Sequence, residues 1–228
     1  MSILILRLEG PLQSWGEHSV YYGEGDTATM PTRSGIVGLL ACALGISKEE
    51  SKEIAALSDS LSLGVRADRP GKLLIDFQTT GAKILQTAEH KSRGTKDTVR
   101  STICSHKQYL EDAAFTVAIT SKDESFITHL AEALQHPSWS IFLGRKSCVP
   151  TRPVFDGILE GDSILEALKA VPVIDSRPAD TRTTLTVELE DDVPHGVGLF
   201  RQDVPSERSR YFYNRLVHRL QIPIPIGE

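Results

Sequence analysis

The residues best suited to chemistry stand at the start of an apolar run, in the stretch PTRSGIVGLLACALGI. Thr32, Arg33 and Ser34 bring two hydroxyl groups and a guanidinium to the point where a helix is expected to begin. The first amides of a helix lack intrahelical partners and carry the positive end of its dipole, so they bind anions. We predict a phosphate site here, in which Arg33 pairs with the anion and Gly35 lets the backbone come close. Ordinary capping beside a surface arginine is the alternative.

The spacing of apolar residues predicts the helix that carries this site. Pro31 precedes it, Thr32 is a suitable N-cap, and Gly45 is placed to end it. Gly35 and Gly38 lower helix propensity, so we expect another backbone or a ligand to approach them closely. The apolar stripe consists of Ile36, Leu39, Leu40, Ala43 and Leu44.

Positive charge gathers in two segments that are predicted to be loops. Residues 76–110 hold six basic and three acidic side chains, whereas the whole chain of 228 residues has a net charge of -5. Residues 144–152 hold basic side chains and no acidic one. Cations beside hydroxyls and aromatic rings suit single-stranded RNA, although a solvated polar surface is the alternative. The candidate contacts are Lys91, Arg93, Lys96, Arg100, His106 and Lys107 in the first segment, and Arg145, Lys146 and Ser147 in the second.

Gln13 and Trp15 follow the first predicted strand, at an edge of the same expected RNA face. A tryptophan there could stack on an extruded base, which contributes about 1–3 kcal/mol in single-strand binders. The alternatives are that Trp15 closes the end of the core or meets a neighbouring subunit.

Composition sets the broad class of the protein. With 40% hydrophobic and 24% charged residues the chain has enough apolar material for a core, and the acidic balance argues against indiscriminate binding to nucleic acid. Three cysteines without short spacing predict a reducing, cytoplasmic setting. No apolar stretch is long enough to span a membrane, so no membrane association is expected.

The order of predicted elements is typical of one fold class. Strands are expected at 3–10, 61–68, 72–81, 114–120 and 140–148, and helices at 32–45, 49–61 and 123–135. This is the βαββαβ order of a ferredoxin-like α+β fold, with a polar insertion before the third core strand. We expect this domain to occupy residues 1–150. The C-terminal extension, residues 151–228, is expected to be smaller and mostly β, and the carboxylates of ELEDD near residue 190 are expected to be solvated.

Four ordered motifs resemble one family: LILRLEGPLQSWGEHS, PTRSGIVGLLACALGI, YLEDAAFTVA and FLGRKSCVPTRPVFDG. The chain is similar to the CasD-type subunit of the type I-E CRISPR surveillance complex, Cascade. The resemblance implies a RAMP protein with an RRM-like body and a β-hairpin thumb at about 81–110. It implies a non-catalytic subunit without cofactor or metal that caps the 5′ handle of CRISPR RNA (crRNA). The implied partners are that crRNA, the backbone subunit and the PAM-recognising large subunit, together with target DNA in the assembled complex.

A catalytic function is the alternative to a non-catalytic scaffold function. Related proteins of type I-C complexes cut the repeat RNA without metal, which requires a general base and a cation near a 2′-hydroxyl. The alternative function is therefore a metal-independent endoribonuclease that processes CRISPR repeat RNA. Its candidate residues, with a nearby lysine, are His18, Tyr21, Tyr22, His90 and His106.

Overall fold

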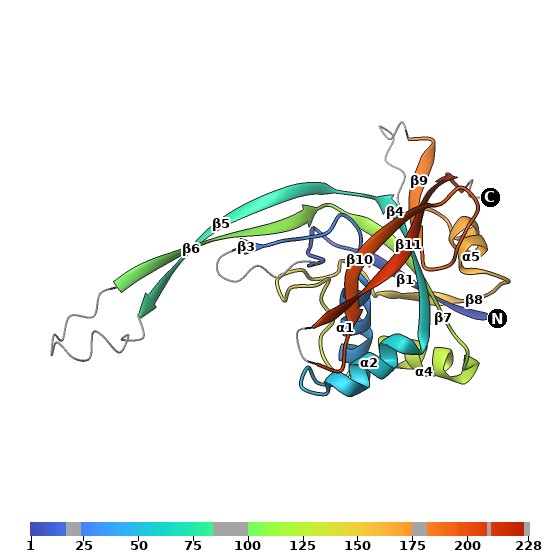
Figure 1. Ribbon diagram of the computed structural model, residues 1–228, viewed down its shortest axis with the longest axis horizontal. Helices are drawn as coiled ribbons and strands as arrows, with labels where there is room; N and C mark the ends of the chain where they lie inside the picture. The colour runs from blue at the N-terminus through green and yellow to red at the C-terminus, as the bar shows by residue number, and fades with distance from the viewer. Residues whose placement is uncertain (17–23, 84–99, 175–181, 209–210, 226–228) are drawn as a thin grey trace.

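The protein has an α+β fold, described by a computed structural model over residues 1–16, 24–83, 100–174, 182–208 and 211–225 (Figure 1). For residues 80–83 and 100–103 the description covers the backbone alone. The helices are α1 (Arg33–Leu44), α2 (Ser51–Asp59), α4 (Glu124–Gln135) and α5 (Ile164–Ala170). The strands are β1 (Ser2–Glu9), β2 (Leu12–Gln13), β3 (Glu24–Gly25), β4 (Leu61–Arg69), β5 (Lys72–Lys83), β6 (Arg100–Glu111), β7 (Ala114–Ser121), β8 (Phe155–Glu160), β9 (Thr184–Leu189), β10 (Val197–Pro205) and β11 (Phe212–Pro223).

The main sheet has seven antiparallel strands in the order β10-β11-β9-β4-β7-β1-β8. The strands predicted at 3–10, 61–68 and 114–120 are confirmed as β1, β4 and β7. The strand predicted at 140–148 is wrong, because that segment is irregular and β8 pairs with β1 instead. The sheet takes strands from both sides of residue 150, so the C-terminal strands extend the sheet that β1, β4 and β7 begin.

Alternation along β1 gives the sheet two apolar faces. Leu4, Leu6 and Leu8 belong to the larger core, which α1 and α4 also enter, while Ile3 and Ile5 belong to a second core with α5. Side chains of successive residues point to opposite faces of a strand, so a continuous apolar run is what a sheet covered on both sides requires. Burial of each such side chain contributes about 1.5–3 kcal/mol.

Helix α1 begins and ends where its sequence predicts. The Thr32 side chain accepts a hydrogen bond from the Gly35 amide, and Gly45 closes the helix with a φ of 79°. The Gly45 amide donates to the carbonyls of Ala41 and Cys42, which satisfies two of the last orphan carbonyls. The predicted capping roles of Thr32 and Gly45 are confirmed.

A long hairpin of β5 and β6 reaches away from the body (Figure 1). Its antiparallel register runs from Lys72 opposite Glu111 to Lys83 opposite Arg100. The arms therefore begin at Lys72 rather than near residue 81, and the predicted strand 72–81 is an arm of this hairpin. Short strands β2 and β3 pair with the base of β6, so the hairpin is anchored beside the N-terminal segment.

Candidate nucleic-acid interface

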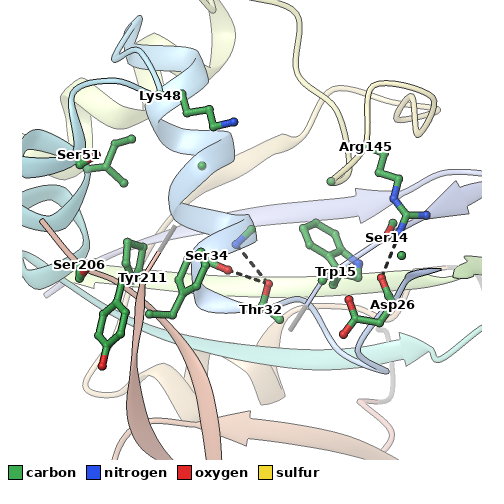
Figure 2. Close-up of a pocket in the computed structure, with 18 of the residues that line it drawn as sticks. Ser14, Trp15, Asp26, Thr32, Ser34, Lys48, Ser51, Arg145, Ser206 and Tyr211 are labelled. Atoms are coloured by element: carbon green, nitrogen blue, oxygen red, sulfur yellow. Dashed lines mark hydrogen bonds between the residues drawn. The ribbon is translucent and has the colours of Figure 1, made fainter. Parts of the chain in front are cut away.

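A groove of about 940 Å³ opens beside the first half of α1 (Figure 2). Ser34, Gly35 and Gly38 of α1 form its floor. Trp15, Asp26 and Arg145 lie toward one end, and Ser51, Ser206 and Tyr211 lie toward the other (Figure 2). The groove thus joins the helix mouth and the basic loop, which the sequence predicted to share one face.

The mouth of α1 holds a carboxylate of the chain itself. Asp203 in β10 accepts a hydrogen bond from the backbone amide of Arg33 at 2.7 Å, and its side chain is buried. The Gly35 amide donates to the Thr32 hydroxyl at 3.3 Å. A carboxylate near a helix N-terminus is favoured by the helix dipole. An internal anion therefore holds part of the position predicted for RNA phosphate.

The Arg33 side chain turns inward, away from the groove. Only 5% of the residue is exposed, its Nε donates to Ser58 Oγ at 2.9 Å, and Nη2 donates to the Leu61 carbonyl at 2.8 Å. Nη1 forms an ion pair with Glu190. The predicted phosphate contact of Arg33 is therefore wrong, because the guanidinium is buried and its donors are already used.

Arg215 completes a buried network behind the helix mouth. Its Nε lies 2.7 Å from Asp203 Oδ1 and its Nη1 lies 3.0 Å from Glu190 Oε1. Burial alone would lower the pKa of Arg215, but hydrogen bonding and charge from Asp203, with Glu190 and Glu188, raise it on balance. Two arginines and two carboxylates, Arg33, Arg215, Asp203 and Glu190, thus neutralise one another. The expectation that the ELEDD carboxylates are simply solvated is wrong for Glu190 and also for Glu188, which is buried and paired with Arg219.

Gln13 and Trp15 are structural rather than exposed. The Gln13 side-chain amide donates to the carbonyls of Leu8 at 3.0 Å and Ala113 at 2.8 Å, and its oxygen accepts from Trp15 Nε1 at 3.0 Å. Gln13 is 0% exposed and Trp15 is 1% exposed. A direct RNA contact of Gln13 and base stacking by Trp15 are therefore contradicted, and the alternative of a core tryptophan is confirmed.

Gly35 is explained by this tryptophan. A Cβ at Gly35 would lie 2.7 Å from a ring carbon of Trp15, closer than real Cβ contacts. The close approach expected at Gly35 is real, but the approaching group is Trp15 instead of a ligand. Trp15 thereby holds the N-terminal segment against the floor of the groove.

Arg145 ties the basic loop to the base of the hairpin. Its Nη1 donates to the Gln108 carbonyl at 2.9 Å and its Nη2 to the Asp26 carbonyl at 3.3 Å. Its guanidinium carbon lies 4.7 Å from the centre of the Tyr109 ring, a cation–π arrangement. Arg145 is half-buried and lines the groove, so its predicted RNA contact remains a prediction.

The other predicted contacts fall on different surfaces. Lys146 and Ser147 are exposed and do not line the groove. His106 is exposed and packs against Phe77, with ring centres 5.2 Å apart, whereas Lys107 stands opposite Asp76 in the ladder. Consecutive residues of a strand point to opposite faces, so His106 and Lys107 cannot serve one face of the hairpin together.

Four predicted thumb contacts cannot be placed as side chains. Arg100 begins β6, but only its backbone is described. The remaining three, Lys91, Arg93 and Lys96, lie outside the described residues. Their RNA contacts stay predictions.

Sequence reasoning missed residues on the far side of the groove. Lys48, Ser51, Ser206, Arg208 and Tyr211 all line it. The polar stretch SERSRY between β10 and β11 held the available signal, because it combines cations, hydroxyls and an aromatic ring. Its proximity to α1 depends on the sheet order, which the sequence pattern did not give.

The candidates for catalysis or metal binding are sparse in the described ranges. Of the proposed ribonuclease residues, only His106 is described, while His18, Tyr21, Tyr22 and His90 lie outside. The described part of the chain contains no group of three His, Cys, Asp or Glu side chains able to hold a metal ion. Nor does any described helix have the length and apolar character needed to cross a bilayer.

Comparison with known proteins identifies the family of the chain. A family model described as CRISPR-associated protein (Cas_Cas5) matches residues 3–218. The CRISPR system Cascade subunit CasD of Escherichia coli (strain K12) is 38% identical over 175 residues, which cover 73% of this chain and 75% of that protein.

Two solved structures match nearly the whole fold. A chain of a structure titled CRISPR RNA-guided surveillance complex has a TM-score of 0.74 and 31% identity, covering 98% of this chain and 91% of its own. A crystal structure of a Cas protein has a TM-score of 0.70 and 32% identity, covering 99% and 98%. From the family match over most of its length, together with these relatives, the chain belongs to the CRISPR-associated Cas5 family.

Proposed function

We propose that this protein is the CasD-type subunit of a type I-E Cascade complex, where it holds the 5′ handle of crRNA without cutting it. The observation that carries the proposal is the groove, which brings the mouth of α1, the Arg145 loop and the base of the β5–β6 hairpin together. The similarity to a Cascade subunit and to a chain of an RNA-guided complex supports this assignment.

The chemistry of the groove suits a polyanion with sugar hydroxyls. Among its described lining residues are three cations, Lys48, Arg145 and Arg208, and one acid, Asp26. Five serine and threonine side chains also line it, and the two that are partly exposed, Ser34 and Ser51, can donate to phosphate or accept from a 2′-hydroxyl. Ile54, Pro205, Tyr211 and Phe212 also line it, so the groove offers apolar surface for bases beside the polar groups that suit a sugar–phosphate backbone.

The connectivity of the body is consistent with a ferredoxin-like, RRM-like core. In chain order it runs β1, α1, β4, β7, α4 and β8, with α2 and the β5–β6 hairpin as additions. These four strands are neighbours in the order β4-β7-β1-β8, and both helices enter the core on one face. We propose that the β5–β6 hairpin is the thumb of the family.

An exposed apolar stripe on the hairpin suits a protein partner. Leu73, Ile75 and Phe77 are 58%, 57% and 58% exposed and alternate along one face of β5. Three large apolar side chains in a row on a projecting element are typical of an interaction surface. We propose that this stripe contacts the backbone subunit, while the large subunit and target DNA join in the assembled complex.

The test is binding and cleavage of cognate RNA by the purified full-length chain. Fluorescence anisotropy with a 3′-labelled handle RNA should show saturable binding at physiological salt, stronger than to a scrambled RNA of equal length. Repeat RNA incubated with the protein and EDTA should remain intact. Absence of handle binding would overturn the RNA role, and cleavage at a single position would establish the endoribonuclease alternative instead.

A further inference from the structure

Gly38 has no structural reason to be glycine. It lies in the middle of α1, it is exposed, and a Cβ placed on it would meet no heavy atom within 4 Å. Glycine is the least favourable residue in a helix interior after proline, so a side chain here would make α1 more stable. Gly35 has Trp15 against it, but Gly38 borders only the open groove. The missing side chain therefore keeps space for something outside the chain.

The segment between β10 and β11 contributes Ser206, Arg208 and Tyr211 to the lining of the groove, and Ser206 and Tyr211 lie toward the end opposite Trp15 (Figure 2). The Ser206 hydroxyl accepts from the Arg208 amide at 3.1 Å and donates to the Arg208 carbonyl at 3.0 Å, which fixes the local backbone. Tyr211 lines the groove and is 55% exposed, and Tyr213 packs edge-on against it with ring centres 5.5 Å apart. One aromatic ring is thus held in place while much of its surface stays open.

The cations on this side are available, unlike the predicted Arg33. Lys48 and Arg208 are exposed, and neither side chain forms an ion pair with another described residue. Both line the groove that has Gly38 on its floor. A cation in water at a groove rim can neutralise a phosphate without first breaking an internal bond.

We infer that this half of the groove is a nucleotide subsite, in which an unpaired ribonucleotide strand lies across Gly38. Lys48 and Arg208 contact its phosphates, and one base stacks on Tyr211. The inference rests on the proposed function and deepens it, because it assigns part of the RNA site to the C-terminal segment. Two exposed cations and the partly exposed hydroxyls of Ser34 and Ser51 favour a sugar–phosphate chain over a peptide as the occupant.

The first test places a side chain at Gly38, where it would enter the groove. Gly38→Leu introduces a good helix former into open space, so the thermal midpoint should not fall. Handle RNA affinity, measured by anisotropy on the full-length chain, should fall at least tenfold. Ala56→Leu is the matched control, because Ala56 is an exposed position of α2 that does not line the groove. Affinity that is equal for wild type, Gly38→Leu and Ala56→Leu would overturn the subsite.

Salt dependence tests the two cations independently of folding. In single-stranded RNA each lost phosphate contact reduces the slope of log K against log salt by about 0.7, so the pair Lys48→Gln and Arg208→Gln should reduce it by about 1.4. Lys122→Gln with Lys169→Gln, at an exposed and a half-buried position that both lie outside the groove, should leave the slope unchanged. An unchanged slope in the groove pair would contradict phosphate contact there.

The aromatic contact has a control on the neighbouring ring. Tyr211→Leu should weaken RNA binding by about tenfold through loss of stacking. Tyr213→Leu should weaken binding much less, because Tyr213 packs against the Tyr211 ring but does not itself line the groove. Equal losses in both variants would indicate a structural effect of the tyrosine pair and would count against stacking.

The outcomes separate this inference from the proposed function. If the wild type binds handle RNA and the groove variants bind equally well, the subsite is wrong and the RNA role stands. If the wild type binds no handle RNA, the subsite and the proposed RNA role are both wrong. If the groove variants bind RNA normally but fail to enter the complex, the groove holds a partner's peptide segment and the nucleotide subsite is overturned.

Discussion

The carboxylate of Asp203 lies 2.7 Å from the backbone nitrogen of Arg33, so the mouth of α1 is capped from β10, 170 residues later in the chain. Asp203 also holds Arg215, and Arg215 reaches Glu190, the partner of Arg33. This closed set of charges fixes the C-terminal strands against α1. It thereby places the β10–β11 turn beside the groove.

Arg33→Ala should act on stability first. The variant leaves the buried Ser58 and Leu61 groups without their donor and leaves Glu190 with Arg215 as its partner, and each unsatisfied buried group costs about 1–3 kcal/mol. Urea unfolding should therefore show a large loss in the free energy of unfolding. Arg152→Ala, at a side chain that is 44% exposed, should change that free energy by less than about 1 kcal/mol. An Arg33→Ala protein of normal stability but reduced RNA affinity would show that our assignment of this side chain is wrong.

Gln13 should be a stability residue as well. Gln13→Ala leaves two buried carbonyls and the Trp15 indole without their partner, and an unsatisfied buried group costs about 1–3 kcal/mol. The free energy of unfolding should fall by at least that amount. Gln202→Ala, on an exposed position of β10, serves as the control and should change it by less than about 0.5 kcal/mol. A neutral Gln13→Ala variant would refute the structural role.

The three cysteines should differ in reactivity toward iodoacetamide. Burial raises the pKa of the Cys42 and Cys148 thiols, so their reactive thiolates form at higher pH than usual. Cys104 on β6 is exposed. At about pH 8, timed mass spectrometry should find Cys104 alkylated first and Cys148 last. Labelling of Cys42 and Cys148 should increase only when the pH is raised further. Early labelling of Cys148 in the folded protein would contradict its buried position.

The apolar stripe of the hairpin should matter for assembly and not for folding. Replacing Ile75 and Phe77 together with Ser should leave the thermal midpoint nearly unchanged, because both side chains are more than half exposed. Recovery of the subunit with the other Cascade proteins in a co-purification should fall strongly. Val149→Ser, at an exposed apolar residue outside β5 and β6, should not affect recovery. Normal assembly of the double variant would show that the stripe is not part of the interface with the backbone subunit.

Local signals predicted much of the fold. The apolar run at 3–10 and the capped helix from Thr32 to Gly45 appear as β1 and α1, because short-range patterning decides both. The segment 140–148 begins with apolar residues, and this pattern predicts a strand that the structure does not contain. Its Gly144 has a φ of 95°, which breaks an extended strand, and the loop packs against Ser14. The true edge strand β8 was missed because most of its side chains are exposed and give no apolar alternation.

Part of the lining of the groove could be predicted from the sequence. Of the candidates at the helix mouth and at residues 144–147, Thr32, Ser34 and Arg145 line one groove, whereas Arg33, Lys146 and Ser147 do not. Side-chain direction was not predictable, because Arg33 turns toward Glu190, 157 residues away in sequence. For the same reason the contribution of Arg208 and Tyr211 was invisible before the sheet order was known.

A reconstruction of the assembled complex with its crRNA, at a resolution that shows side chains, tests the central claim most directly. The account predicts that the 5′ handle occupies the groove, with its backbone against Gly38, phosphates within hydrogen-bond distance of Lys48 and Arg208, and a base on Tyr211. A handle bound to another face, with this groove filled by protein or left open to solvent, would contradict it.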